Sequence, residues 1–181
     1  MRTLAEDIQA AVDYHGHVCS GIVLGVRMAH LALDRLKIDN PLEYRDLIVY
    51  VEVDRCVSDA VYAVTGCTLG RRRMKWVDYG KMAAAFYDLA TKQGVRVVVT
   101  GSHFPLPDED PLLFWGNIPD ADVFTVQDVS IDIPKEDLPG KPLLKIECEN
   151  CRERIMDGRE KRVKGRVLCR ACAGEAYYKR I

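Results

Sequence analysis

Near the end of the chain lies the stretch CENCRERIMDGREKRVKGRVLCRAC, residues 148–172, in which two C-x₂-C pairs flank 17 residues. Each pair can place two thiolates on one cation, and four sulfurs at ~2.3 Å complete the tetrahedron that Zn²⁺ prefers in closed structural sites. We therefore assign Cys148, Cys151, Cys169 and Cys172 as ligands of a structural zinc. The surrounding segment has few aliphatic side chains, so it cannot form a core without the metal.

The residues around these ligands predict a treble-clef finger over 145–181. The pattern between the pairs favours a hairpin, with Arg159–Val163 and Arg166–Leu168 as its arms and Gly165 in the turn. A helix over Ala173–Tyr178 would carry the last two ligands at its start.

A larger domain, residues 1–140, precedes the finger, and prolines at 134, 139 and 142 with Gly140 mark the linker. Apolar spacing predicts helices at Leu4–Tyr14, Ser20–Leu36 and Cys56–Val64, and a short one at Pro111–Trp115. Strands are predicted at Leu47–Asp54, Met74–Tyr79, Val95–Thr100 and Val123–Ile133. Met82–Ala90 favours helix by alanine propensity alone.

Composition places the chain among soluble globular proteins, with 48% hydrophobic and 29% charged residues. No apolar run approaches the ~20 residues that span a bilayer. The first eight residues contain acids where a signal peptide would be uninterruptedly apolar. We expect a cytoplasmic protein without a membrane partner, in which seven cysteines serve as metal ligands or reactive thiols rather than disulfides.

Charge divides unevenly between the two parts. Residues 145–181 hold 11 Lys/Arg against 6 Asp/Glu, whereas residues 1–144 hold 15 against 21. A basic module on an acidic core suits nucleic acid or an acidic partner, and an ordinary solvated finger rich in Lys and Arg accounts for it equally. Besides Tyr177 and Tyr178 the finger has few aromatic residues, and it lacks a recognition helix, so nucleic acid is disfavoured.

A second group of metal-binding residue types lies between the first two predicted helices. His15, His17 and Cys19 occupy alternate positions, which point the same way in an extended segment. Imidazole and thiolate both bind borderline or soft transition metals. Cys19 also lies directly before a helix, whose N–H groups favour a nucleophilic thiolate, and Gly21 permits close approach of a ligand.

A third group follows the first predicted strand. Cys56 and Asp59 are three residues apart and share a helix face, so either can join His17 and Cys19 in one site. The alternative is that Cys56 and Cys67 are small buried hydrophobes and that one histidine caps a helix.

The remaining candidates have structural interpretations that we prefer. Arg71-Arg72-Arg73 is expected to be a solvated turn, with an anion clamp beside Cys67 as the alternative. In that alternative Cys67 and Arg71 contact a substrate. His30 lies in an apolar helix and is expected to be a core histidine, and His103, beside Pro105, to be part of a loop.

Four separated motifs resemble the FmdE family, named for a component of molybdenum or tungsten formylmethanofuran dehydrogenase. They are His15-Gly-His-Val-Cys-Ser-Gly21, Cys56-Val-Ser-Asp-Ala60, Thr65-Gly-Cys-Thr-Leu-Gly70 and Asp78-Tyr-Gly-Lys81. Members of this family often carry a treble-clef finger at the C-terminus. The resemblance implies an α+β fold with a mixed helix and antiparallel-sheet core, and it favours a strand at Lys81–Phe86.

The resemblance also implies a homodimer whose core cavity, lined by His15, His17, Cys19, Cys56 and Asp59, binds a second transition metal. We expect a metal-binding protein that serves a molybdenum/tungsten oxidoreductase complex, as in methanogenesis. Family members also occur in organisms that make no methane, so the name assigns no substrate. A catalytic version makes Cys19 a nucleophilic or redox thiol assisted by His17. The alternatives are an adaptor whose basic finger docks a protein or nucleic acid, and a carrier of metal or molybdenum cofactor.

Overall fold

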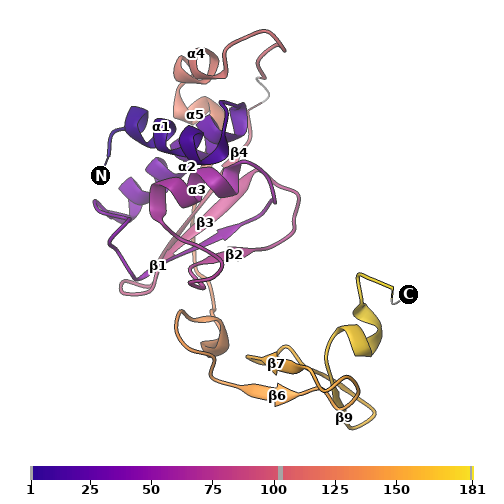
Figure 1. Ribbon diagram of the computed structural model, residues 1–181. Helices are drawn as coiled ribbons and strands as arrows, with labels where there is room; N and C mark the ends of the chain where they lie inside the picture. Colours follow the sequence, from indigo (N-terminus) through magenta and orange to yellow (C-terminus); the bar gives the residue numbers. More distant parts are fainter. Residues whose placement is uncertain (1, 102–103, 180) are drawn as a thin grey trace. The chain divides into compact units, whose positions relative to one another are not determined.

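The computed structural model describes residues 2–101, 104–179 and 181, and Figure 1 shows their course. Contacts within the chain divide it into two compact units, Met1–Asp132 and Ile133–Ile181. His103, which we expected in a loop, lies outside the described residues.

The first unit is a five-stranded sheet with helices packed against it. Its strands are β1 (Leu47–Val51), β2 (Met74–Trp76), β3 (Ala83–Asp88), β4 (Gln93–Val99) and β5 (Phe124–Val129), in the order β2-β1-β3-β4-β5. Its helices are α1 (Leu4–His15), α2 (Ser20–Leu36), α3 (Val57–Thr65), α4 (Pro111–Gly116) and α5 (Asp120–Val123). Four strands pair antiparallel, and the short β2 runs parallel to β1.

Helix α2 is the centre of the core. Its apolar residues surround most of the helix, and the fully buried ones include Ile22, Leu24 and Met28. Helices α1, α2 and α3 lie on one face of the sheet (Figure 1). Gly25 permits α2 to approach α3 closely, because a Cβ there would lie 2.6 Å from the Cβ of Ala60. The predicted bounds of this helix, Ser20–Leu36, are confirmed.

Several predictions for this unit need correction. The strands predicted at Leu47–Asp54 and Met74–Tyr79 end three residues earlier, at Val51 and Trp76. The strand over Val123–Ile133 is shorter, since Asp120–Val123 forms a helical turn and β5 ends at Val129. Alanine propensity predicts a helix at Met82–Ala90, and this prediction is wrong: Ala83–Asp88 is a strand between β1 and β4, buried at every position. Burial in the sheet overrides the helix propensity of the alanines. The strand expected at Lys81–Phe86 from the family resemblance agrees with this result.

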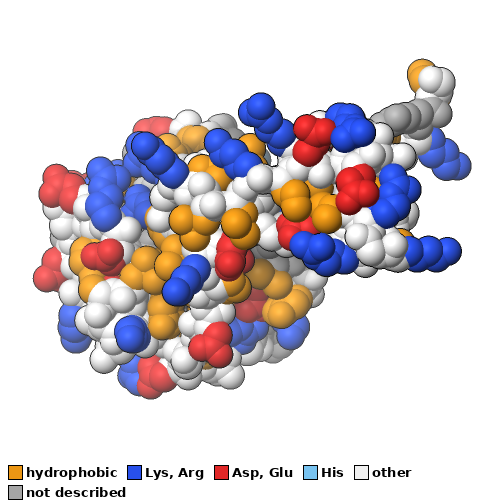
Figure 2. All heavy atoms as spheres, turned by 90° about the horizontal axis from the view of Figure 1, so that it is seen from below, with side chains coloured by type: hydrophobic (Ala, Val, Ile, Leu, Met, Phe, Trp, Pro, Cys, Tyr) orange, Lys and Arg blue, Asp and Glu red, His pale blue; other side chains and the backbone are white. Residues whose placement is uncertain are grey.

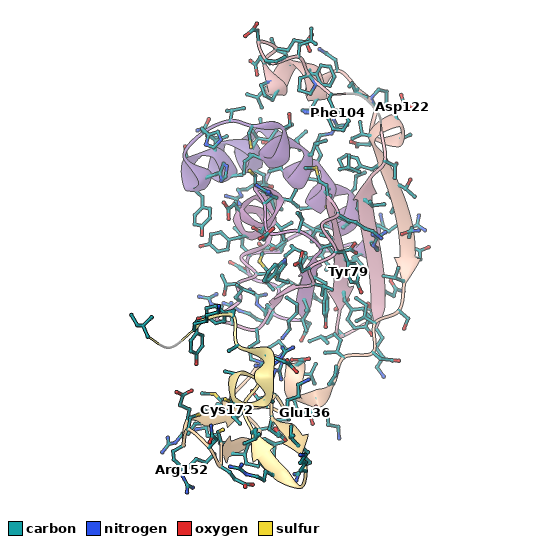
Figure 3. The ribbon with its side chains drawn as sticks, turned by 90° about the vertical axis from the view of Figure 1, so that its right-hand side faces the viewer. Tyr79, Phe104, Asp122, Glu136, Arg152 and Cys172 are labelled. Atoms are coloured by element: carbon teal, nitrogen blue, oxygen red, sulfur yellow. The ribbon has the colours of Figure 1, made fainter. Side chains whose placement is uncertain are left out.

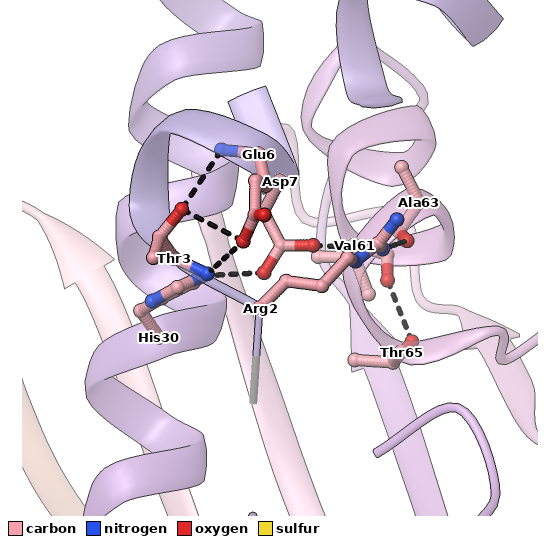
Figure 4. A network of polar contacts seen from close by, with 8 residues as sticks. All are labelled: Arg2, Thr3, Glu6, Asp7, His30, Val61, Ala63 and Thr65. Atoms are coloured by element: carbon pink, nitrogen blue, oxygen red, sulfur yellow. Dashed lines mark hydrogen bonds and ion pairs between the residues drawn. The ribbon is translucent and has the colours of Figure 1, made fainter. Parts of the chain in front are cut away.

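The N-terminal helix is fixed to its neighbours by a polar network (Figure 4). Thr3 and Glu6 form the predicted capping box at the start of α1. Asp7 is 1% exposed and pairs with Arg2 at 2.7 Å and with Nε2 of His30 at 2.7 Å. His30, on α2, is thus a partly buried structural residue, and the network fixes the helix at whose end the histidine segment begins.

The second unit consists of two small hairpins and a final turn. Its strands are β6 (Lys145–Glu147), β7 (Arg154–Met156), β8 (Lys161–Val163) and β9 (Arg166–Leu168), preceded by η1 (Lys135–Asp137) and followed by η2 (Ala171–Glu175). The predicted hairpin is confirmed by the β8–β9 pairing, with Lys164 and Gly165 at φ 50° and 79°. The predicted helix at Ala173–Tyr178 is wrong, because Gly174 turns the chain at φ 96° and only a short turn, η2, forms around Cys172.

Candidate functional site

The core site begins where α1 ends. Gly16 adopts φ 95° as the C-cap of α1, a conformation that favours glycine, and the chain then runs to Cys19 at the N-cap of α2. This turn places His15 and His17 on the two sides of the glycine, with ring centroids 4.5 Å apart. The predicted junction of two helices therefore positions all three candidate ligands.

The ligand atoms of His15, His17 and Cys19 lie within 4.8 Å of one another. His15 presents Nε2 to the sulfur of Cys19 at 3.9 Å. His15 and Cys19 are half-buried and His17 is exposed, so the cluster lies at the protein surface with one open side. Two imidazoles and one thiolate form a suitable donor set for Zn²⁺ and for other borderline transition metals.

Asp59 approaches this cluster from α3, but it contacts the other side of the His15 ring. Its Oδ2 lies 2.8 Å from Nδ1 of His15. A carboxylate at Nδ1 fixes the proton there and leaves Nε2 as the ligating atom, which is the usual arrangement around metal-bound histidines. The geometry thus gives Asp59 the position of an orienting partner, whereas we expected a ligand.

Cys56, the N-cap residue of α3, lies against Cys19. Burial raises the pKa of the Cys56 thiol, and the neighbouring Cys19 acts in the same direction. Gly21 makes this approach feasible: a Cβ at Gly21 would lie 2.8 Å from the Cβ of Cys56 and 3.8 Å from the sulfur of Cys19. We expected Gly21 to admit a ligand; in the structure it admits Cys56. The Cys56 sulfur lies beside Cys19 but is not among the ligand atoms that come within 4.8 Å of one another.

The weaker candidate residues, Cys67 and the arginines at 71–73, have different environments in the structure. Cys67 is fully buried, its thiol faces the carbonyl of Leu47 at 3.6 Å, and burial raises its pKa, which suits a small hydrophobe better than a reactive thiol. The prediction that Arg71–Arg73 forms a solvated turn is wrong for Arg73. The Arg73 side chain is 3% exposed and donates hydrogen bonds to the carbonyls of Tyr44 and Gly66. Arg71 is exposed, and its contact with a substrate stays a prediction.

The four cysteines of the finger gather as the spacing predicts, and Cys172 is labelled in Figure 3. Backbone N–H groups surround the sulfurs: that of Cys169 donates to Cys148 at 3.2 Å, and that of Cys172 to Cys169 at 3.4 Å. The N–H of Cys151 has the largest effect among several that together lower the pKa of Cys148 to about 6. These donors stabilise the thiolate of Cys148. The N–H of Glu153 acts likewise on Cys151, but burial and the three neighbouring thiols outweigh it and raise the pKa of Cys151 to about 12. A cation shared by the four sulfurs offsets this mutual repulsion, so the residues fit the structural zinc.

A cavity near the core site includes Cys67, the candidate substrate contact of the sequence analysis, in its lining, whereas Arg71 is not among the described lining residues. It has a volume of about 510 Å³ and opens between α3, β1 and β2, with Asp59 in its wall. Its other aromatic and acidic residues, Tyr14, Tyr62, Trp76 and Asp54, come from four separate segments. Each alone is ordinary, and only the fold brings them together.

Comparison with known families agrees with these two parts. A family model described as "FmdE, Molybdenum formylmethanofuran dehydrogenase operon" matches residues 14–115. A second model, described as "Prokaryotic dksA/traR C4-type zinc finger", matches residues 142–178.

A curated relative from Archaeoglobus fulgidus, named "Probable S-adenosyl-L-methionine-binding protein", is 34% identical over 96 residues. The match covers 51% of this chain and only 26% of that protein, so the chain spans about a quarter of the relative's length. A crystal structure of a tungsten formylmethanofuran dehydrogenase FmdE-like protein from Syntrophus aciditrophicus superimposes with a TM-score of 0.64 at 22% identity. That likeness covers 98% of this chain and 96% of the other, and it shows the fold.

The resemblance first suggested by the motifs around Cys19, Cys56 and Cys67 is therefore confirmed over more than half of the sequence: the chain belongs to the FmdE family.

Proposed function

We propose that this metal-binding FmdE-like protein holds a transition metal in its core, separate from the zinc of its finger, with His15, His17 and Cys19 as ligands and Cys56 as the fourth donor. The observation that carries the proposal is the convergence of three ligand atoms within 4.8 Å. The Asp59–His15 contact supports it, since it prepares Nε2 to ligate.

Elemental analysis of the purified protein tests the proposal. The wild type should contain two metals per chain, the Cys19→Ser variant one, and the Cys148→Ser variant one. Cys67→Ala is the matched control, because Cys67 is a cysteine of the same unit outside the cluster, and it should retain both metals.

A single metal per chain that disappears with Cys148→Ser would contradict the core site. So would a Cys19→Ser variant with unchanged metal content and a folded core, as judged by circular dichroism.

In a catalytic version of the proposal, Cys19 is a nucleophilic or redox thiol assisted by His17, and the two residues then act in place of ligating a metal. His17 is the exposed member of the cluster, so a substrate can reach it. The role in a molybdenum/tungsten oxidoreductase complex rests on family membership. Copurification with such an enzyme, lost in Cys19→Ser but retained in Cys67→Ala, is the expected result.

The alternative function, an adaptor or a carrier of metal or molybdenum cofactor, is supported by the exposed side chains of the finger. Tyr177 is 98% exposed, and Lys or Arg residues occupy exposed positions along β8 and β9. Lys161 and Arg170 both pair with Glu175, and Figure 2 shows acidic as well as basic side chains at the surface. A surface with both signs of charge favours a protein partner over nucleic acid, and binding that weakens steeply with salt would reverse that preference.

A homodimer and a cytoplasmic location complete the proposal. Sedimentation of the purified protein should give twice the chain mass. Among the described residues, no helix has the length and apolarity to cross a bilayer.

A further inference from the structure

We propose that the cavity beside the core metal centre binds a cationic ligand built on a flat aromatic ring, such as an aromatic amine. The inference rests on the proposed function, since the cavity belongs to the centre through Asp59, which lines it and orients His15.

The size and walls of the cavity suit a small molecule. Its volume of about 510 Å³ is within the ~300–1,000 Å³ of typical ligand pockets. Val51, Val53 and Met74 form an apolar floor of buried side chains. A ligand in this space loses water contact on its apolar side, which favours a ring over a flexible polar chain.

Aromatic side chains stand at the rim. Tyr14 packs on Tyr62 with ring centroids 4.6 Å apart, and Trp76 projects from β2 with 52% of its surface exposed. Both Tyr14 and Tyr62 line the cavity, so their pair forms a preorganised wall. Exposed Trp and Tyr faces attract flat rings and cations alike.

The charged lining selects the sign of the ligand. Two acidic residues, Asp54 and Asp59, line the cavity together with Ser58 and Thr68, and no Lys, Arg or His is among the described residues that line it. Asp59 uses Oδ2 for His15, and its side chain remains 36% exposed. An ammonium placed here gains charge-assisted hydrogen bonds, whereas a carboxylate or phosphate meets repulsion.

The test compares three indole ligands of similar size by isothermal titration calorimetry with the full-length protein: tryptamine, the neutral tryptophol and the anionic indole-3-acetate. Tryptamine should bind with a Kd of about 1 mM or tighter. Tryptophol should bind about tenfold more weakly and indole-3-acetate not measurably.

Two substitutions localise the binding without touching the metal cluster. Asp54→Asn should remove the preference for tryptamine over tryptophol, and Trp76→Leu should weaken both. Asp39→Asn, which removes an exposed carboxylate outside the cavity, is the control and should change neither. Metal content is measured on each sample.

Equal affinity for the three ligands, or a preference that survives Asp54→Asn, would overturn the inference. Tryptamine affinity that falls as protein concentration rises would also overturn it, because the cavity wall would then be an interface between copies. Two metals per chain without tryptamine selectivity refute this inference alone, whereas selective binding by a protein that lacks the core metal refutes the proposed function alone.

Discussion

The two cysteine clusters of this protein differ in the size of the hydrophobic core that surrounds them. Among the described residues of the finger, the buried hydrophobic cluster is small and consists of Cys148, Ile155 and Leu168, so one of its members is itself a candidate zinc ligand. The core cluster borders a large hydrophobic core that extends from Ala11 to Phe124. The same residue types should therefore serve opposite purposes: in the finger the metal makes the fold, and in the core the fold makes a site for the metal.

The largest expected effect is loss of the finger metal. Cys148→Ser, or a strong chelator, should unfold residues 133–181, because structural zinc contributes an apparent ~10–16 kcal/mol to such folds. Limited proteolysis should then cleave this unit while the unit 1–132 stays resistant and keeps its melting temperature. A metal-free finger that resists protease would show that the contrast between the two clusters is wrong.

Gly21→Ala tests whether packing in the core unit holds the core cluster in place. The new Cβ would clash with Cys56 at 2.8 Å, and such overpacking costs about 1–3 kcal/mol. Denaturant unfolding should show that loss, and elemental analysis should show loss of the core metal with the finger zinc retained. Gly116→Ala, where a Cβ meets nothing within 4 Å, is the control and should leave both measurements unchanged.

Asp59→Ala should separate metal affinity from stability. Removing the partner of a ligating histidine weakens metal binding about 10–100-fold. Competition with a chromophoric chelator should detect this change at the core site only. Asp54→Ala is the control, because Asp54 lies in the same cavity wall and no contact between it and His15 is found among the described residues. An equal loss of metal affinity in Asp54→Ala would contradict the role of Asp59.

The smallest effect concerns the sheet and is independent of both clusters. Tyr44 donates to Asp88 at 2.8 Å, and this bond raises the pKa of its phenol to about 12. Because the phenol pKa is higher in the folded protein than in the unfolded chain, the hydrogen bond stabilises the fold fully below pH ~10, by about 1 kcal/mol. This stabilisation is lost as pH rises through the pKa of Tyr44 in the folded protein. Tyr44→Phe should lower the stability of unit 1–132 at pH 8, and its difference from wild type should shrink above pH 10. A constant difference across that range would refute the assignment.

Much of the local structure follows from spacing that is visible in the sequence. The α2 helix has the predicted bounds because its apolar residues repeat at helical period without interruption from Ser20 to Leu36. The failures lie where tertiary contacts compete with local preference. Three alanines at 83–85 favour helix, yet their small side chains fit the crowded centre of the sheet. Arg73 belongs to a charge run and is nevertheless buried, because two carbonyls from separate loops accept its hydrogen bonds.

By itself the sequence determined the gathering of the four finger cysteines, because two C-x₂-C pairs flank a short hairpin segment. It also determined the convergence of His15, His17 and Cys19, which lie within five residues of chain. The tertiary structure alone decided which further residues approach this cluster. Asp59 and Cys56 are 44 and 37 positions from His15 and Cys19, and the packing of α3 against α1 and α2 brings them there. The cavity beside them, with its aromatic rim and its two carboxylates, also depends on tertiary structure. Packing in the shared hydrophobic core sets the distances between segments, and these distances cannot be read from a local sequence pattern.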